Sequence, residues 1–73
     1  MESFIPTPRE QEIINCLLEG CQNKEIAEKL GISVKTVKCH FNRMFMRAGF
    51  VNGEKRVRLA VMMYKRAEYE QNN

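Results

Sequence analysis

The chain has 73 residues, 44% hydrophobic and 29% charged, with a formal net charge of +3. A chain this short is too small to line a deep catalytic pocket, and with one histidine and no aspartate it offers almost no catalytic set of residues, so we do not expect an enzyme. It holds no apolar run of the ~20 residues that a membrane span needs and no signal peptide at its start, so we expect a cytoplasmic binding domain without a cofactor.

The first predicted helix covers residues 8–19. Thr7 is placed to cap it, Pro8 occupies its first position, and Glu10 is spaced to reach back to the cap, which is the pattern of a capping box. Gly20 is expected to end the helix. The helix carries a predominantly apolar set: Ile13, Ile14, Cys16, Leu17 and Leu18.

A second predicted helix covers residues 24–30 and a third covers 34–48. The second opens at Asn23 and ends at Gly31, which is suited to the left-handed conformation that ends helices. Ser33 then caps the third helix almost at once. A short helix, a tight turn and a new helix are the pattern of a helix-turn-helix, although any pair of packed helices shares it.

The third predicted helix has two unlike faces at 100° per residue. The apolar stripe predicted to face the core comprises Val37, Phe41, Met44 and Ala48, with Phe45 beside it. The opposite side comprises Lys35, Lys38, Cys39, Asn42 and Met46, flanked by Thr36, Arg43 and Arg47. No acidic residue occurs from 34 to 51, and this mixture of groups suits phosphates and base edges, so the face is predicted to bind DNA.

The fourth predicted helix covers residues 53–69 and has apolar residues on two sides. One stripe, Val57, Ala60, Val61 and Tyr64, has helical spacing and is expected to cover the core. The second side is predicted to form the interface of a symmetric homodimer: Leu59, Met62, Met63 and Arg66. The alternative is a monomer whose long last helix covers more of the core.

Charge is unevenly distributed along the chain. Residues 1–33 carry three basic and six acidic side chains, whereas residues 34–66 carry nine basic side chains and one acidic one. A segment with a net charge of +8 is expected to meet a polyanion or an acidic surface. The alternative is that these side chains only solvate helix faces.

The cysteines predict no site. Cys16, Cys21 and Cys39 are too few for a complete disulfide framework, and their spacing together with His40 matches no common zinc pattern. We therefore expect free thiols and no metal. His40 lies at the edge of the core stripe and is expected to be a structural, half-buried side chain.

Several runs of residues resemble one known family. They are Pro8-Arg9-Glu10-Gln11-Glu12-Ile13-Ile14, Leu17, Gly20, Asn23-Lys24-Glu25-Ile26-Ala27, Leu30, Ile32-Ser33, Thr36-Val37-Lys38 and His40. In this register they resemble the LuxR-type, or GerE-like, helix-turn-helix, without a gap from Thr7 to about Phe50. Region 4 of sigma factors shares part of the pattern but differs at its equivalents of Asn23-Lys24 and His40.

The resemblance implies an all-α fold in which residues 1–73 form a single four-helix domain with a long C-terminal helix. It also implies a bacterial transcriptional regulator that binds double-stranded DNA as a homodimer, with the third helix in the major groove and the fourth at the dimer contact. Transferred residue by residue, it predicts base contacts for Lys38, Asn42 and Cys39, and we add Lys35. The resemblance also predicts phosphate contacts for Lys24 and Thr36, and we add Arg43 and Arg47 from their place beside this face.

The chain departs from the family pattern at a few positions. Arg43 stands where the family usually has Asn, and Ala48 where it has Leu, while the larger Phe50 is expected to fill the space that Ala48 leaves. About four extra residues lie within 51–56. Either the fourth helix begins earlier or the loop before it is longer, and each change would alter the dimer geometry.

A second function remains open at this stage. A small helix-turn-helix protein that does not read DNA would bind another regulator or an RNA polymerase subunit through its fourth helix. The basic stretch 55–58 and the second apolar side of that helix would then be the contact surface. The chain starts with Met1 and is expected to be a complete small protein, with a fragment of a longer regulator as the alternative.

Overall fold

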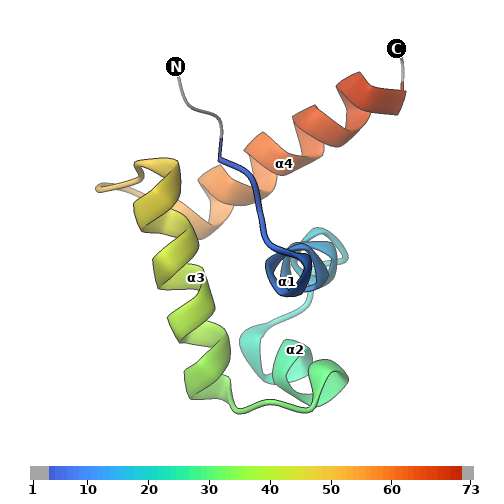
Figure 1. Cartoon of the computed structure of the whole chain (residues 1–73), viewed down its shortest axis with the longest axis vertical. Helices are drawn as coiled ribbons and strands as arrows, with labels where there is room; N and C mark the ends of the chain where they lie inside the picture. Colours follow the sequence, from blue (N-terminus) through green and yellow to red (C-terminus); the bar gives the residue numbers. More distant parts are fainter. Residues whose placement is uncertain (1–3, 72–73) are drawn as a thin grey trace.

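The structure is a computed structural model that describes residues 4–71. These residues form four helices, α1 (Pro8–Leu18), α2 (Asn23–Leu30), α3 (Val34–Ala48) and α4 (Lys55–Gln71), and no strand (Figure 1). The predicted all-α, four-helix fold is confirmed. α1 ends one residue before the expected boundary, α2 begins one residue earlier, and α4 is displaced two residues toward the C-terminus.

The capping box at the start of α1 is present as predicted. The backbone N–H of Glu10 donates to the Thr7 hydroxyl at 3.2 Å, and the N–H of Thr7 donates to the Glu10 carboxylate at 2.9 Å. The capping box satisfies two of the four N–H groups that a helix start leaves without partners, and Pro8 at the first position has no N–H, which removes a third. The helix therefore begins at a position fixed by local sequence.

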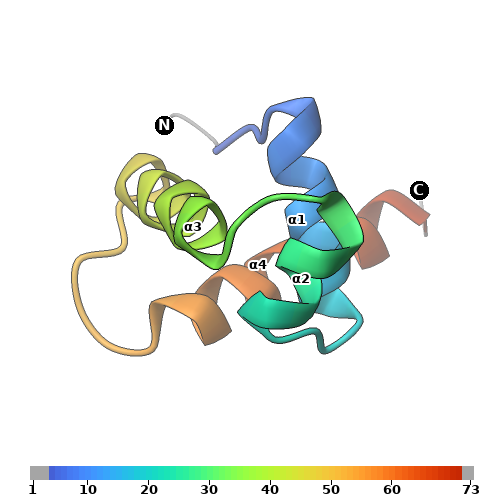
Figure 2. The same cartoon turned by 90° about the horizontal axis from the view of Figure 1, so that it is seen from below.

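The turn between α2 and α3 also follows the sequence. Gly31 has φ 68°, and the hydroxyl of Ser33 accepts the N–H of Thr36 at 3.0 Å, so one helix ends and the next begins within three residues. Figure 2 shows the two helices joined by this short connection. The arrangement is a helix-turn-helix.

The core lies where α1, α2, α3 and α4 converge. Its buried apolar residues are Phe4, Ile13, Ile14, Cys16, Leu17, Cys21, Ile26, Ala27, Val37, Phe41, Met44, Leu59 and Met63. The α3 stripe is buried as predicted, apart from Ala48, which is half-buried against the core together with Phe50. Leu18, the last residue of α1, is 39% exposed.

The structure reverses the predicted assignment of the two apolar sides of α4, except at Ala60, which is half-buried against the core as predicted. Leu59 and Met63, predicted to lie at a dimer interface, are 0% and 6% exposed and pack in the core. Val57, Val61 and Tyr64, predicted to face the core, are 56%, 46% and 58% exposed. The reason is tertiary: α4 packs on both α1 and α3, and this contact selects one of two sides that have similar spacing.

The segment before α4 forms a loop rather than an extra helical turn. α4 begins at Lys55, and the guanidinium of Arg58 folds back to donate to the carbonyl of Asn52 at 3.2 Å. Its carbon lies 4.5 Å from the centre of the Phe50 ring. The longer loop is therefore the alternative that the structure favours. Within residues 4–71, no helix is long and apolar enough to cross a membrane.

Candidate nucleic-acid interface

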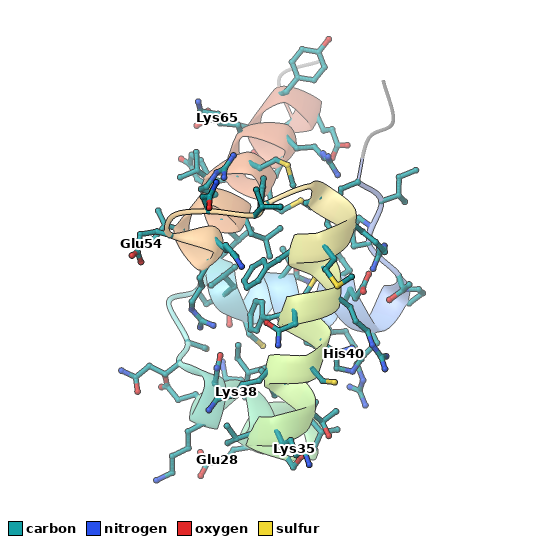
Figure 3. The ribbon with its side chains drawn as sticks, turned by 90° about the vertical axis from the view of Figure 1, so that its left-hand side faces the viewer. Glu28, Lys35, Lys38, His40, Glu54 and Lys65 are labelled. Carbon is teal, nitrogen blue, oxygen red and sulfur yellow. The ribbon has the colours of Figure 1, made fainter. Side chains whose placement is uncertain are left out.

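The outward face of α3 carries most of the polar residues that the sequence predicted to contact DNA. All of them are exposed: Lys35, Thr36, Lys38, Cys39, Asn42 and Arg43. Figure 3 looks onto this face, with Lys35 near the start of α3, Lys38 one turn further, and the half-buried His40 at its edge. The side chains thus share one accessible surface, which we call the α3 face.

Shallow hollows flank the α3 face on both sides. One of about 280 Å³ is lined by Lys35, Thr36, Cys39, His40 and Arg43. Another of about 220 Å³ is lined by Asn23, Lys38, Phe41, Asn42, Phe45 and Arg56. The predicted base-contacting and phosphate-contacting residues of α3 therefore border two neighbouring depressions.

The basic side chains of the chain fall into two groups according to what they contact. The arginines at 47, 56, 58 and 66 all donate hydrogen bonds within the domain. In contrast, Lys35, Lys38 and Arg43 on the α3 face make no hydrogen bond or ion pair with any described residue. The first group holds the fold together, and the second leaves its charges available to a ligand.

Lys24 and Thr36, the predicted phosphate contacts at the start of α2 and α3, differ in their availability. Lys24 is exposed and makes no polar contact within residues 4–71. The hydroxyl of Thr36 lies 2.9 Å from that of Ser33, with which it shares a hydrogen bond. Because a hydroxyl both donates and accepts, Thr36 retains capacity for a further partner.

Arg47 was predicted to contact phosphate, and the structure gives it an intramolecular role instead. Its guanidinium donates to the carboxylate of Glu10 and, at 2.9 Å, to the carbonyl of Ile5, and its carbon lies 4.9 Å from the centre of the Phe4 ring. Glu10 is only 4% exposed. The hydrogen bond from Arg47 holds the pKa of Glu10 below its ordinary value of 4.5, against the opposing effect of burial. A fork of donors used in this way fixes the N-terminal segment to α3.

Two further residues predicted at the dimer interface also contribute to the fold. Arg66 donates to the carbonyl of Phe4 at 2.7 Å, so α4 and α3 together hold the segment that precedes α1 (Figure 1). Met62 is half-buried against the core. It also borders a depression of about 350 Å³, whose other lining residues are Phe50, Val57, Arg58, Val61 and Lys65. Of the four predicted interface residues, Met62 alone lies beside the exposed side of α4.

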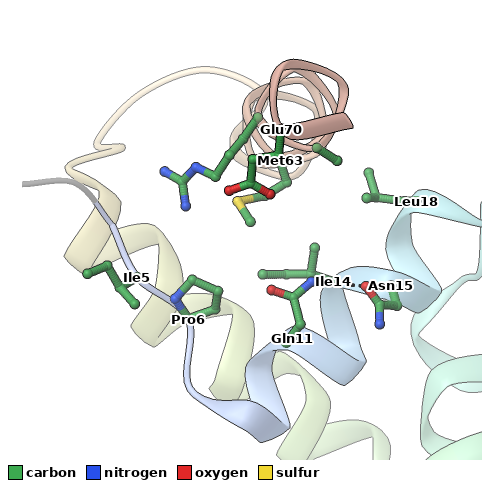
Figure 4. A pocket seen from close by; sticks show the side chains of 10 residues that line it. Ile5, Pro6, Gln11, Ile14, Asn15, Leu18, Met63 and Glu70 are labelled. Atoms are coloured by element: carbon green, nitrogen blue, oxygen red, sulfur yellow. Dashed lines mark hydrogen bonds between the residues drawn. The ribbon is translucent and has the colours of Figure 1, made fainter. Parts of the chain in front are cut away.

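A groove of about 410 Å³ lies between the N-terminal segment, α1 and α4 (Figure 4). Its apolar wall includes Ile5, Ile14, Leu18 and Met63, and its rim carries Gln11, whose side chain donates to Asn15 at 2.9 Å. None of the described residues that line it belongs to α3. The groove is therefore separate from the α3 face.

Sequence reasoning missed two features. It assigned Arg56 no role within the fold. The guanidinium of Arg56 donates to the Asn23 side chain at 2.6 Å and to the carbonyl of Cys21 at 2.7 Å, and it lies 4.7 Å from the centre of the Phe41 ring. Sequence reasoning also did not bring Cys16 together with Cys21. The spacing of these cysteines around Gly20 was the available signal, because a glycine-ended helix folds the next residue back onto its last turn.

Comparison with known proteins adds independent information. The sequence pattern of a family described as bacterial regulatory proteins, luxR family, matches residues 6–63. The chain is 38% identical over 55 residues to the probable transcriptional regulator ycf29 of Cyanophora paradoxa. The aligned residues cover 75% of this chain and 26% of that protein. The chain is 46% identical over 43 residues to DctR, the C4-dicarboxylate transport transcriptional regulatory protein of Rhodobacter capsulatus, covering 59% and 22%.

A third relative is the oxygen regulatory protein NreC of Staphylococcus aureus (strain JH9), which is 47% identical over 45 residues, covering 62% of this chain and 21% of that protein. The chain thus spans about a quarter of the length of these curated relatives. No solved structure matches the chain significantly.

Proposed function

The chain belongs to the LuxR family of bacterial regulatory proteins, and from this premise we propose that it binds specific sequences of double-stranded DNA with α3 in the major groove. DNA-binding transcription regulation is the function of the family domain. The proposal takes residues 1–73 as one such domain, acting as a homodimer in the cytoplasm. It assigns the domain no catalytic activity.

One observation carries the proposal more than any other. The basic side chains on the α3 face are without intramolecular partners, whereas the arginines around it are engaged. A surface with several free cations and no carboxylate on the same helix has a positive potential that attracts phosphates. An ordinary solvated helix face would mix charges of both signs.

Within the proposed complex, one set of residues contacts base edges and a second set contacts phosphates. Lys38, Asn42 and Cys39 are proposed to meet base edges, with Lys35 beside them; an asparagine suits adenine, and a small apolar thiol suits a thymine methyl group. Lys24, Thr36 and Arg43 are proposed to hold phosphates. The free N–H groups at the start of α3 add a positive dipole end for one phosphate. Arg47 is left out of this set because its guanidinium is paired with the carboxylate of Glu10 and bonded to the carbonyl of Ile5.

The test compares DNA affinity at several salt concentrations for three alanine variants. Lys38→Ala is expected to cost about 1–3 kcal/mol on the preferred sequence and to relax preference at one position, whereas Lys24→Ala weakens all sequences about equally and lowers the salt slope by about one. Lys65→Ala, which removes an exposed lysine from α4, is the matched control. Unchanged affinity and preference in Lys38→Ala would show that the register is wrong.

The proposed homodimer uses the exposed side of α4 rather than the side first predicted. Val57, Val61 and Tyr64 follow each other at helical spacing, and each is about half exposed. An apolar stripe of this kind is suited to pack against its own copy around a twofold axis. Sedimentation of the wild type is expected to show a dimer on DNA. A free species of 8.6 kDa without DNA, together with one chain per site on DNA, would contradict the dimer.

The alternative of a protein-interaction module loses the features that suggested it. Arg56 and Arg58 of the basic stretch 55–58 are bonded within the domain, and Leu59 and Met63 are buried. The residues that suggested a contact with an RNA polymerase subunit or a second regulator are therefore largely engaged within the domain. We retain DNA as the partner that the α3 face fits.

A further inference from the structure

The end of α1 brings two thiols together in a place that the proposed DNA contact does not use. The N–H of Gly20 donates to the carbonyl of Leu17 at 2.9 Å, and the N–H of Cys21 donates to the carbonyl of Cys16 at 3.0 Å. These bonds, with φ 88° at Gly20, form a Schellman motif. The motif places the residue after the glycine against the last turn of the helix, so the Cys16 and Cys21 side chains meet.

Glu19 completes a set of three possible metal ligands. The two sulfur atoms and one Glu19 carboxylate oxygen all lie within 4.8 Å of one another. Two sulfurs bound at 2.3 Å to a tetrahedral zinc ion are roughly 3.8 Å apart, so only a small contraction is needed. Cys16 and Cys21 are 7% and 8% exposed, whereas the Glu19 side chain is 64% exposed. An ion held by the three would keep one side open to water.

We propose that Cys16, Cys21 and Glu19 form a binding site for a thiophilic divalent cation of the zinc type, with water as the fourth ligand. Both cysteines bind as thiolates, so two protons leave for each ion bound, and no electron is transferred. The ion and its three ligands carry a net charge of −1. The ammonium group of Lys29, 3.2 Å from Glu19, supplies the balancing charge.

Burial limits the access of dissolved oxidants to the two thiols, because Cys16 and Cys21 are 7% and 8% exposed. A thiophilic cation displaces the proton of each thiol on binding, so its affinity rises with pH.

A bound ion would stabilise more than the end of α1. The carbonyl of Cys21 accepts a hydrogen bond from Arg56, which also contacts Asn23 at the start of α2 and the Phe41 ring in α3. An ion that holds Cys21 in place would therefore also stabilise the contacts of Arg56, which join α4 to α2 and α3. Because the ion binds the folded chain, the melting temperature should rise with its concentration. This inference does not depend on the proposed DNA contact.

The test titrates the full, reduced chain with Co(II), whose bonds to thiolates give charge-transfer absorption, and then displaces Co(II) with Zn(II). We expect one ion per chain, two protons released and a higher melting temperature. Cys16→Ser and Cys21→Ser should each abolish the two-thiolate spectrum, and Glu19→Gln should weaken binding by about tenfold or more. The matched control is Cys39→Ser, which removes an exposed thiol from α3 and should leave the Co(II) spectrum, the proton release and the rise in melting temperature as in the wild type.

Several results would overturn the proposal. They are failure of the wild type to take up Co(II) stoichiometrically, uptake that survives loss of both Cys16 and Cys21, or uptake that depends on Cys39. An intramolecular disulfide formed under mild oxidation in a chain that binds no ion would also overturn it. Cys16→Ala and Cys21→Ala keep the apolar contact at the helix end and replace the serine variants if those unfold.

Discussion

Arg47→Ala tests whether this side chain holds the fold or holds DNA. The guanidinium donates to both carboxylate oxygens of Glu10 and to the carbonyl of Ile5, and it lies over the Phe4 ring. Glu10 is 4% exposed, so alanine leaves a nearly buried carboxylate whose remaining donors come from the capping residue Thr7. We therefore expect a loss of stability.

The size of the loss follows from these contacts. A buried charged group that loses a hydrogen-bond partner costs about 1–3 kcal/mol, and the contact with the Phe4 ring adds about 0.5–1 kcal/mol. The Arg47 side chain is 42% exposed, so solvent screens the pair and the lower part of the first range applies. The sum is about 2 kcal/mol, which at a urea m-value of roughly 1 kcal/mol/M lowers the unfolding midpoint by about 2 M.

Urea unfolding followed by far-UV circular dichroism measures this shift. Arg43→Ala is the matched control, because Arg43 lies on the same helix without an intramolecular partner. It should unfold like the wild type but lower the salt slope of DNA binding by about one. Folded Arg47→Ala should show the reverse pattern. An unchanged midpoint together with a reduced salt slope in Arg47→Ala would refute the assignment and restore Arg47 as a phosphate contact.

Three other predictions follow from the same structure. Because Arg47 lowers the pKa of Glu10 below 4.5 in the folded chain, the pair stabilises the fold above pH 4.5, and this stability is lost as the pH falls through the folded pKa. The urea midpoint of Glu10→Gln should therefore vary less with pH below 4.5 than that of the wild type, and the same pH dependence in both proteins would exclude the effect. Gly31→Ala forces an alanine into φ 68° with no atom within 4 Å of the new Cβ, so it should cost about 1–2 kcal/mol from the backbone alone, with Gly31→Asn closer to the wild type; no change on urea unfolding would count against the turn. Val61→Glu, on the exposed side of α4, should abolish the dimer in sedimentation while the circular dichroism spectrum is unchanged; a persistent dimer would exclude that stripe.

The sequence predicted the features that depend on neighbouring residues. The capping box at Thr7, the helix end at Gly31 and the cap at Ser33 each involve groups three or four residues apart, so their geometry is encoded locally. The α3 faces were also predictable, because its apolar residues form one stripe and its charges lie on the other side. Local chemistry and helical period therefore account for α1 to α3.

The sequence did not predict which side of α4 is buried. Val57 and Val61 have the same four-residue spacing as Leu59 and Met63, so periodicity alone supports either side. The choice is made by contacts with α1, at the other end of the chain, and with α3, and the helical period of α4 alone does not contain them. The predicted dimer interface is wrong for the same reason, because it was placed on the side of α4 that carries the buried Leu59 and Met63.

Counting charges in residues 34–66 likewise does not show which cations stabilise the fold and which remain free for a ligand. Arg47, Arg56 and Arg66 each donate to a backbone carbonyl far away in the sequence, which a planar guanidinium with several donors does well. Lys35 and Lys38 carry single compact charges on flexible stems and remain free. A net charge of +8 thus contains a structural part, carried by arginines that fix the N-terminal segment and α2 against α3 and α4, and a smaller part on the α3 face. Only the smaller part should appear in the salt dependence of DNA binding, so the slope should reflect the free cations rather than the formal charge.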